Sequence, residues 1–423
     1  SPSRGLGDVY KRQGLGITLP GLDIQFAPQF VYASNPSYPG VTETKNYQAI
    51  NLGYSHVKLH LGPASIGIST APFTWGPSIA NPLLMSNNHP GFTHAIFESR
   101  RPLKTPIGNF EWQYFAGFLD PMQKGYTNLS ELLYADGRYV LDTKERRFMN
   151  GGMMVYHPRG IKGVSVGVGR VVQEMESEYN LDHKWNLLFK NVARVNDASY
   201  TIEQAQDQYA EAFLRWVLPQ SHAELYAEWG RNDAFFNYRD AIQQPEHSRG
   251  YTFGMRKLFN ISANQKNYYQ FISEYTRIQQ PSTWPVRSAF SWYVHSEVYP
   301  GYTQNGQVLG APIGPGGNAG MIRLSEFKGN IQKAIQFESI THEAEIYEDG
   351  GLAFVNPSIS KWVDYGFSLF YEKKLQHIFV STKLAYKRSF NYQWTQPSSA
   401  SGLGLKNPND IDSFMLQLVL RYY

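Results

Sequence analysis

The sequence has 423 residues, with 39 basic and 35 acidic side chains, a net charge of +4 and no cysteine. The missing cysteine excludes disulfide frameworks, cysteine nucleophiles and cysteine–zinc sites, and the balanced charge excludes the clustered basic surface that nucleic acid requires. Aromatic residues make up 15% of the chain, which favours pleated sheets over helices. No run approaches the roughly 20 apolar residues of a membrane-spanning helix. This polar composition is typical of a soluble protein or of a membrane β-barrel, whose strands are half polar.

The first thirteen residues, SPSRGLGDVYKRQ, lack an initiator methionine and resemble translated adapter sequence at the start of a gene fragment. We therefore predict that residues 1–13 are an artefact and that residues 14–423 form the native domain. On this interpretation the native N-terminus, with any signal peptide, is missing from the sequence. The absence of a signal peptide then carries no information about localisation.

His56 and His60 are the first candidate metal ligands in chain order. A helix would bring residues at this spacing together, whereas a strand separates them by about 13 Å, too far for one ion. Strand context is favoured and no third ligand is evident. The sequence therefore predicts no metal site and no cofactor.

Residues 73–92, FTWGPSIANPLLMSNNHPGF, have neither a helical nor a strand period. They contrast with segments of strict period two that follow them. The clearest such segment is the hairpin YAEAFLRWVLPQSHAELYAEWG, in which apolar and polar side chains alternate on both arms around Pro219. Other alternating segments lie at 110–118, where Phe115 and Leu119 blur the pattern, and at 164–168, 269–276, 363–372 and 412–423. Residues 182–208 fit a strand and a loop better than a helix.

Two architectures use such strands. A soluble β-sandwich buries the apolar face in a core, and a membrane barrel turns it to lipid. Segments of about 9–11 residues, aromatics near the segment ends, and short turns alternating with long connections favour the barrel. Roughly 14–18 candidate strands are present. We predict an all-β, antiparallel transmembrane β-barrel.

Two sequence features invite a catalytic interpretation. Glu224 and Glu228, with Glu211 and Arg215 across the hairpin, resemble a glycosidase carboxylate set, but acid–base ladders of this kind also line barrel lumens. GAPIGPGGNAG (residues 310–320) lacks the lysine and hydroxyl of a phosphate loop, so we predict an external flexible loop there. No G-x-S-x-G motif occurs. The protein is therefore predicted not to be an enzyme.

Aromatic and amide side chains outside the strands favour sugar contact, because sugars stack on aromatic planes and form hydrogen bonds with amides and cations. The alternative is that they are ordinary residues of a plug. We predict a polysaccharide-binding or plug set of Trp75, Asn87, Asn88, His89, Arg100, Arg101, Tyr299 and Tyr302.

Residues 73–102 also carry a family resemblance. The motifs Trp75-Gly76-Pro77, Leu83-Leu84-Met85 and Ser86-Asn87-Asn88, followed by Pro90 and Arg100, resemble the signature of the capsule assembly proteins of the Wzi type. Later segments up to Gly320 agree, including the hairpin at 207–233.

The resemblance implies an outer-membrane barrel of about 18 strands with its lumen occluded by loops. It also implies a lectin-like role in attaching capsular polysaccharide to a Gram-negative cell, without enzymatic activity. The predicted partners are surface polysaccharide and outer-membrane lipid, with no nucleic acid, and the predicted state is a monomer. The alternatives are a porin for sugars or other small polar solutes, and an outer-membrane hydrolase.

Overall fold

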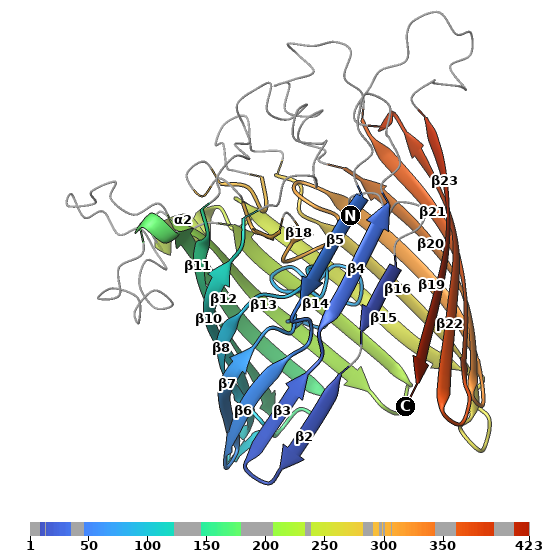
Figure 1. Cartoon of the computed structure of the whole chain (residues 1–423), viewed down its shortest axis with the longest axis horizontal. Coiled ribbons are helices and arrows are strands. Elements are labelled where there is room, and N and C mark those ends of the chain that lie inside the picture. Colours follow the sequence, from blue (N-terminus) through green and yellow to red (C-terminus); the bar gives the residue numbers. More distant parts are fainter. Residues whose placement is uncertain are drawn as a thin grey trace, which may run out of the picture.

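The structure is a computed structural model that describes residues 9–12, 14–34, 46–121, 145–178, 206–232, 238–281, 291–295, 298, 301–305, 307–342, 361–392 and 410–422. Long antiparallel strands dominate these residues and tilt around a common central space (Figure 1). The predicted all-β, antiparallel barrel is confirmed.

Within the described residues the barrel wall contains eighteen strands. They are β2 (Leu15–Leu19), β3 (Leu22–Phe26), β6 (His56–Leu61), β7 (Ala64–Ser69), β8 (His94–Ser99), β9 (Leu103–Thr105), β10 (Gly108–Leu119), β11 (Arg147–Pro158), β12 (Val164–Met175), β13 (Gln206–Leu218), β14 (Ala223–Asn232), β15 (Arg249–Phe259), β16 (Asn267–Arg277), β19 (Asn318–Lys328), β20 (Ile331–Thr341), β21 (Val363–Lys374), β22 (Ile378–Phe390) and β23 (Ile411–Tyr422). Neighbours in this order pair antiparallel, except that β8 and β9 both pair with β10. Among the described residues no ladder joins β2 to β23.

Two small sheets accompany the wall. One contains β1 (Val9–Arg12), β4 (Gln29–Ser34) and β5 (Asn46–Asn51). In this sheet β4 lies between β1 and β5 and pairs antiparallel with both. The other joins β17 (Thr303–Gln304) to β18 (Gln307–Val308). The pairing of β1 does not decide whether residues 1–13 are native, so that expectation stays a prediction.

The two ends of the barrel differ in the length of their connections. One end carries short turns, such as residues 62–63, 219–222 and 329–330, and the other carries long connections, such as residues 70–93, 233–248 and 278–317. Outer-membrane barrels place short turns in the periplasm and long loops outside the cell. We call these the short-turn end and the long-connection end.

The outward face of the wall is apolar and the inward face is polar. On β23 the side chains of Phe414, Leu416, Leu418, Leu420 and Tyr422 are 61–82% exposed. The inward carboxylates Glu211, Glu224 and Glu228 of β13 and β14 are buried. A soluble sandwich would bury the apolar face instead, so the structure rejects that alternative.

Helical structure is scarce in the described part of the chain, where the assigned helices are the 3₁₀ turn η1 (Glu176–Glu178) and α2 (Tyr238–Gln243). No helix among these residues has the length and apolarity needed to span a membrane. Strand β13 begins at Gln206, so the predicted strand near Tyr209 is confirmed. The predicted loop before residue 206 lies largely outside the described residues.

Candidate functional site

The irregular stretch noted in the sequence lies inside the barrel. We call residues 70–93, which join β7 to β8, the first plug loop; in Figure 1 it is the light blue segment within the curve of the sheet. Leu83, Leu84 and Met85 at its centre are fully buried, and Trp75 is 4% exposed. Backbone without ladder partners is tolerated at membrane depth only inside a protein, so its partners must come from the wall or from other buried segments.

Glu274 of β16 is the main partner of this backbone. Its carboxylate accepts hydrogen bonds from a run of four residues in the loop and from the Tyr226 hydroxyl at 2.7 Å. The loop donors are the Ser78 hydroxyl (2.9 Å) and the backbone N–H groups of Ile79 (2.7 Å), Ala80 (3.1 Å) and Asn81 (2.9 Å). Hydrogen bonds to a charged acceptor are the stronger class, so one side chain fixes a complete turn of the loop.

Glu228 of β14 holds the same loop from the neighbouring side. Its carboxylate accepts hydrogen bonds from the backbone N–H groups of Ser78 at 2.7 Å and Leu83 at 3.1 Å. Gly76, at φ +77°, lies against this carboxylate, and a Cβ there would come within 2.4 Å of Glu228 Oε1 and 2.9 Å of Glu211 Oε1. The glycine of the Trp-Gly-Pro motif is therefore required both for its backbone angle and for its lack of a side chain.

Aromatic packing fixes the start and the end of the first plug loop. Phe115 of β10 meets Phe73 at 5.0 Å and Phe92 at 5.7 Å between ring centroids. The Trp75 indole donates a hydrogen bond to Gln113 Oε1 at 2.6 Å. Phe115 and Leu119, which blurred the sequence alternation, are fully buried on the inward side, in the cluster that includes the loop.

His89 in the loop is buried and accepts a hydrogen bond from the Gly91 N–H at 3.1 Å through Nδ1. Burial, and then the neighbouring His94, lower the pKa of His89 to about 3. The imidazole is therefore neutral near pH 7, and its neutrality is a condition of plug packing.

A second piece of chain completes the plug. We call the described residues between 291 and 317 the second plug segment. The Tyr293 hydroxyl donates to the Leu83 carbonyl at 2.7 Å and accepts from the Ala311 N–H at 2.9 Å. Ser86 N–H donates to the Leu309 carbonyl at 2.8 Å. A Cβ on Gly310 would lie 2.3 Å from the Leu83 carbonyl oxygen, so the two backbones meet there directly.

Arg147 of β11 binds the second plug segment to the wall. Its fully buried guanidinium donates hydrogen bonds to the carbonyls of Gly301 and, at 2.7 Å, Thr303. It also donates to Gln173 Oε1 at 3.3 Å. The plug is thus held by carboxylates that accept hydrogen bonds from N–H groups and by a guanidinium that donates hydrogen bonds to carbonyls.

The structure separates the predicted set by position. Trp75, His89 and Tyr302 are buried in the plug, and Asn88 is half-buried and donates to the Val308 carbonyl at 3.1 Å. Asn87 is exposed. Arg100 and Arg101 are exposed between β8 and β9, at the short-turn end and away from the first plug loop. Tyr299 lies outside the described residues.

Other sequence expectations also have outcomes. His56 and His60 lie on a strand, as predicted, and bond separately to Asp23 (3.0 Å) and Ser65 (2.9 Å). The part of the chain that the structure describes contains no metal-ligand cluster. The prediction of an external loop at residues 310–320 is wrong, because Ala311 and Ile313 are buried against the plug. Gly-rich backbone suits close packing as well as flexibility.

The carboxylates that hold the plug were missed in part. The predicted acid–base ladder exists between Arg215 and Glu224 at 3.0 Å. Glu228 belongs to the predicted carboxylate set, but it faces the loop, and Glu274 is in none of the predicted sets. The sequence signal that could have identified Glu228 and Glu274 was an acidic residue at an inward strand position with no basic residue opposite it.

The chain can be placed by comparison with known proteins. Residues 10–397 match the family described as capsule assembly protein Wzi. The chain belongs to this family. The predicted family resemblance is confirmed, and with it the outer membrane of a Gram-negative cell as the location of the barrel. No curated protein matches the sequence.

Several solved structures are similar to this Wzi-family chain, and one of them supports its fold. One is Escherichia coli Wzi, an outer-membrane protein involved in group 1 capsule assembly and described as a carbohydrate-binding β-barrel. It matches with a TM-score of 0.62 and 12% identity over 92% of this chain and 76% of that one. Pseudomonas aeruginosa OccK7 (OpdD) and opdK both match with a TM-score of 0.46, at 12% and 10% identity, over 97% and 98% of this chain and 90% and 92% of theirs. These last two likenesses are too distant to carry an argument.

Proposed function

We propose that this barrel binds or anchors capsular or other surface polysaccharide at the cell surface and does not act as a diffusion pore. The observation that supports this proposal is the plug. Glu228 and Glu274 hold it inside the lumen by accepting hydrogen bonds from N–H groups of residues 78–83. Family membership and the carbohydrate-binding character of Escherichia coli Wzi support the ligand class. A porin would need an open aqueous path instead.

We infer a binding role rather than catalysis. Glycoside hydrolysis needs two carboxylates that face one substrate at a defined separation. Glu228 and Glu274 are occupied by plug amides, and Glu224 is occupied by Arg215. A hydrolase interpretation would be revived if Glu224→Gln and Glu228→Gln abolished a measured glycan-cleaving activity.

For the contact residues, Asn87 is the exposed member of the predicted set in the first plug loop. We propose that Asn87 contributes to glycan contact, and that buried Trp75, His89 and Tyr302 act by shaping the plug beneath it. Arg100 and Arg101, at the short-turn end, would meet only glycan that approaches from the periplasm.

The experiment has two readouts on purified protein in detergent. Binding to an array of bacterial capsular polysaccharides is expected, together with the absence of steady conductance in planar bilayers. A steady large conductance would overturn the closed-lumen proposal in favour of the porin. Failure to retain any polysaccharide, with a folded barrel verified by heat-modifiable gel mobility, would overturn the binding proposal.

A further inference from the structure

The outward face of β13–β16 carries two rows of paired residues near the long-connection end. The ladders align Ala212, Trp229, Tyr251 and Arg277 in the first row. They align Leu214, Ala227, Phe253 and Tyr275 in the second row, one step towards the short-turn end. Each row therefore contains a small side chain beside large ones.

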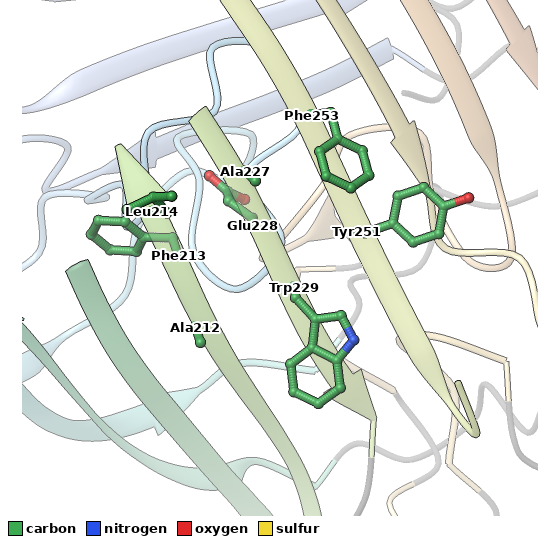
Figure 2. A pocket seen from close by; sticks show the side chains of 8 residues that line it. All are labelled: Ala212, Phe213, Leu214, Ala227, Glu228, Trp229, Tyr251 and Phe253. Carbon is green, nitrogen blue, oxygen red and sulfur yellow. The ribbon is translucent and has the colours of Figure 1, made fainter. Parts of the chain in front are cut away.

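A groove of about 570 Å³ follows from this alternation of sizes. Its walls are Leu214, Trp229, Tyr251 and Phe253, and the alanines at 212 and 227 form low points between them. Figure 2 shows these side chains on three adjacent strands. The groove is continuous with the lipid-facing wall, so hydrocarbon is the solvent that surrounds it.

Two arginines lie next to the groove, on the side of the long-connection end. Arg277 ends the first row, and Arg249 lies two residues from Tyr251 on the same outward face of β15. The Arg249 guanidinium is 5.1 Å from the centroid of the Tyr251 ring. Among the described residues, Arg249 Nη1 and Arg277 Nε are buried atoms without a hydrogen-bond acceptor, and Glu246 is the acidic group that acts on Arg249. Among the described residues, positive charge therefore exceeds negative charge at this edge.

We propose that this surface binds one phosphorylated lipid of the outer leaflet, with an acyl chain in the groove and a phosphate between Arg249 and Arg277. The rings of Trp229, Tyr251 and Tyr275 mark the interfacial girdle, which sets the arginines at headgroup depth. A guanidinium matches phosphate oxygens through two parallel hydrogen bonds, and weak solvation there strengthens them.

The charge excess favours this occupant over others. A zwitterionic headgroup brings its own cation, which two arginines repel. A second copy of the chain would present the same two arginines to their equivalents across a twofold interface, which is also repulsive. A phosphorylated, multiply acylated glycolipid such as lipid A supplies both the anion and the hydrocarbon that the surface requires.

The test uses native mass spectrometry of the full chain in detergent with diphosphorylated lipid A, and with the same lipid lacking its phosphates. We expect one tightly held phosphorylated lipid per chain and at least about tenfold weaker retention of the phosphate-free lipid. Higher salt should weaken retention of the phosphorylated lipid alone. Equal retention of the two lipids would overturn the proposal, and this comparison needs no variant.

Variants then locate the site. Arg249→Gln with Arg277→Gln should lower retention at least about tenfold, and Ala227→Trp, which fills the groove, should lower it as well. Lys257→Gln is the matched control, because Lys257 is on the outward side of β15 at the short-turn end. Unchanged retention in the folded arginine variant, or dimers that Ala227→Trp abolishes, would overturn the lipid site. Neither readout depends on polysaccharide binding.

Discussion

The two pieces of the plug are held by opposite kinds of hydrogen-bonding group. The first plug loop presents N–H groups to the wall, and Glu228 and Glu274 receive them. The second plug segment presents carbonyl oxygens, and Arg147 donates hydrogen bonds to them. Irregular backbone inside a barrel needs hydrogen-bond partners. Where the backbone presents N–H groups the wall provides an acceptor, and where it presents carbonyls the wall provides a donor. The comparison therefore predicts that each piece can be released separately.

The largest effect is expected from Glu274→Ala. The change removes the acceptor of three backbone N–H groups and two hydroxyls, and of these the Asn81 N–H keeps a second acceptor, Ser78 Oγ at 3.1 Å. We expect a loss of about 4 kcal/mol of unfolding free energy and frequent conductance openings in planar bilayers, because the first plug loop loses its anchor.

Glu224→Ala is the matched control for this variant. Glu224 is also a buried inward carboxylate of the wall, but it pairs with Arg215 rather than with the plug. It should leave the lumen closed. Equal conductance of the two variants would contradict the anchoring role of Glu274.

Arg147→Met tests the other side of the comparison. We expect a loss of about 3 kcal/mol, since the carbonyls of Gly301 and Thr303 lose their buried hydrogen bonds from Arg147, although the Gly301 carbonyl keeps Gln173 Nε2 at 3.2 Å and the Thr303 N–H at 3.0 Å as donors. The neighbouring Arg146 is half-exposed and pairs with Glu176 at 2.6 Å, so Arg146→Met should change thermal unfolding by less than about 1 kcal/mol. A similar loss in both variants would show that charge alone, and not plug contact, matters at this position.

The wall was predictable from the sequence, and the plug contacts were not. Period two reveals which side chains share a face, so β10, β12, β13, β14, β16, β21 and β23 could be recognised from residues such as Leu214 and Leu416. It cannot reveal which inward residue meets which loop, because Ser78 and Glu274 are 196 positions apart. The burial of residues 310–320 was missed for the same reason.

The plug loop itself was identified by a motif whose physical basis appears only in the structure. Gly76 is required because two carboxylates lie where its side chain would be, and neither carboxylate is near it in sequence. The loop has Asn and Ser side chains of its own that can bond to backbone groups. Wall carboxylates satisfy most of residues 78–83 instead, since only they are fixed in place by strands.

Gly76→Ala sharpens this point. We expect a loss of about 2–3 kcal/mol from the positive φ and from displacement of Glu228, whose bond to Ser78 would break. Gly314→Ala is the control, because Gly314 has φ +83° and no atom within 4 Å of its added Cβ. It should cost only about 1 kcal/mol. Chemical denaturation of both variants measures the difference, and equal losses would rule out the close contact as the cause.

The pH dependence of the first plug loop provides a fourth test. The pKa of His89 is lowered to about 3 in the fold, so the unfolded chain binds the proton first as pH falls. The stability that the neutral His89 side chain contributes is complete above about pH 6.5. Below that pH the free energy of unfolding falls by roughly 1.4 kcal/mol per pH unit, which is about 2 kcal/mol at pH 5. His89→Asn should remove this part of the pH slope in thermal unfolding. An unchanged slope would exclude His89 as its source.

Tyr293→Phe should give the smallest effect and addresses the contact between the two pieces. Its hydroxyl alone bridges the Leu83 carbonyl of the first plug loop and the Ala311 N–H of the second plug segment. Removing it should cost about 1–2 kcal/mol, with the ring packing retained. In a double-mutant cycle with Glu274→Ala, a coupling energy above about 0.5 kcal/mol would mean that the two pieces act as one plug. Additive losses would mean that the carboxylates and the guanidinium of the wall hold two independent obstructions.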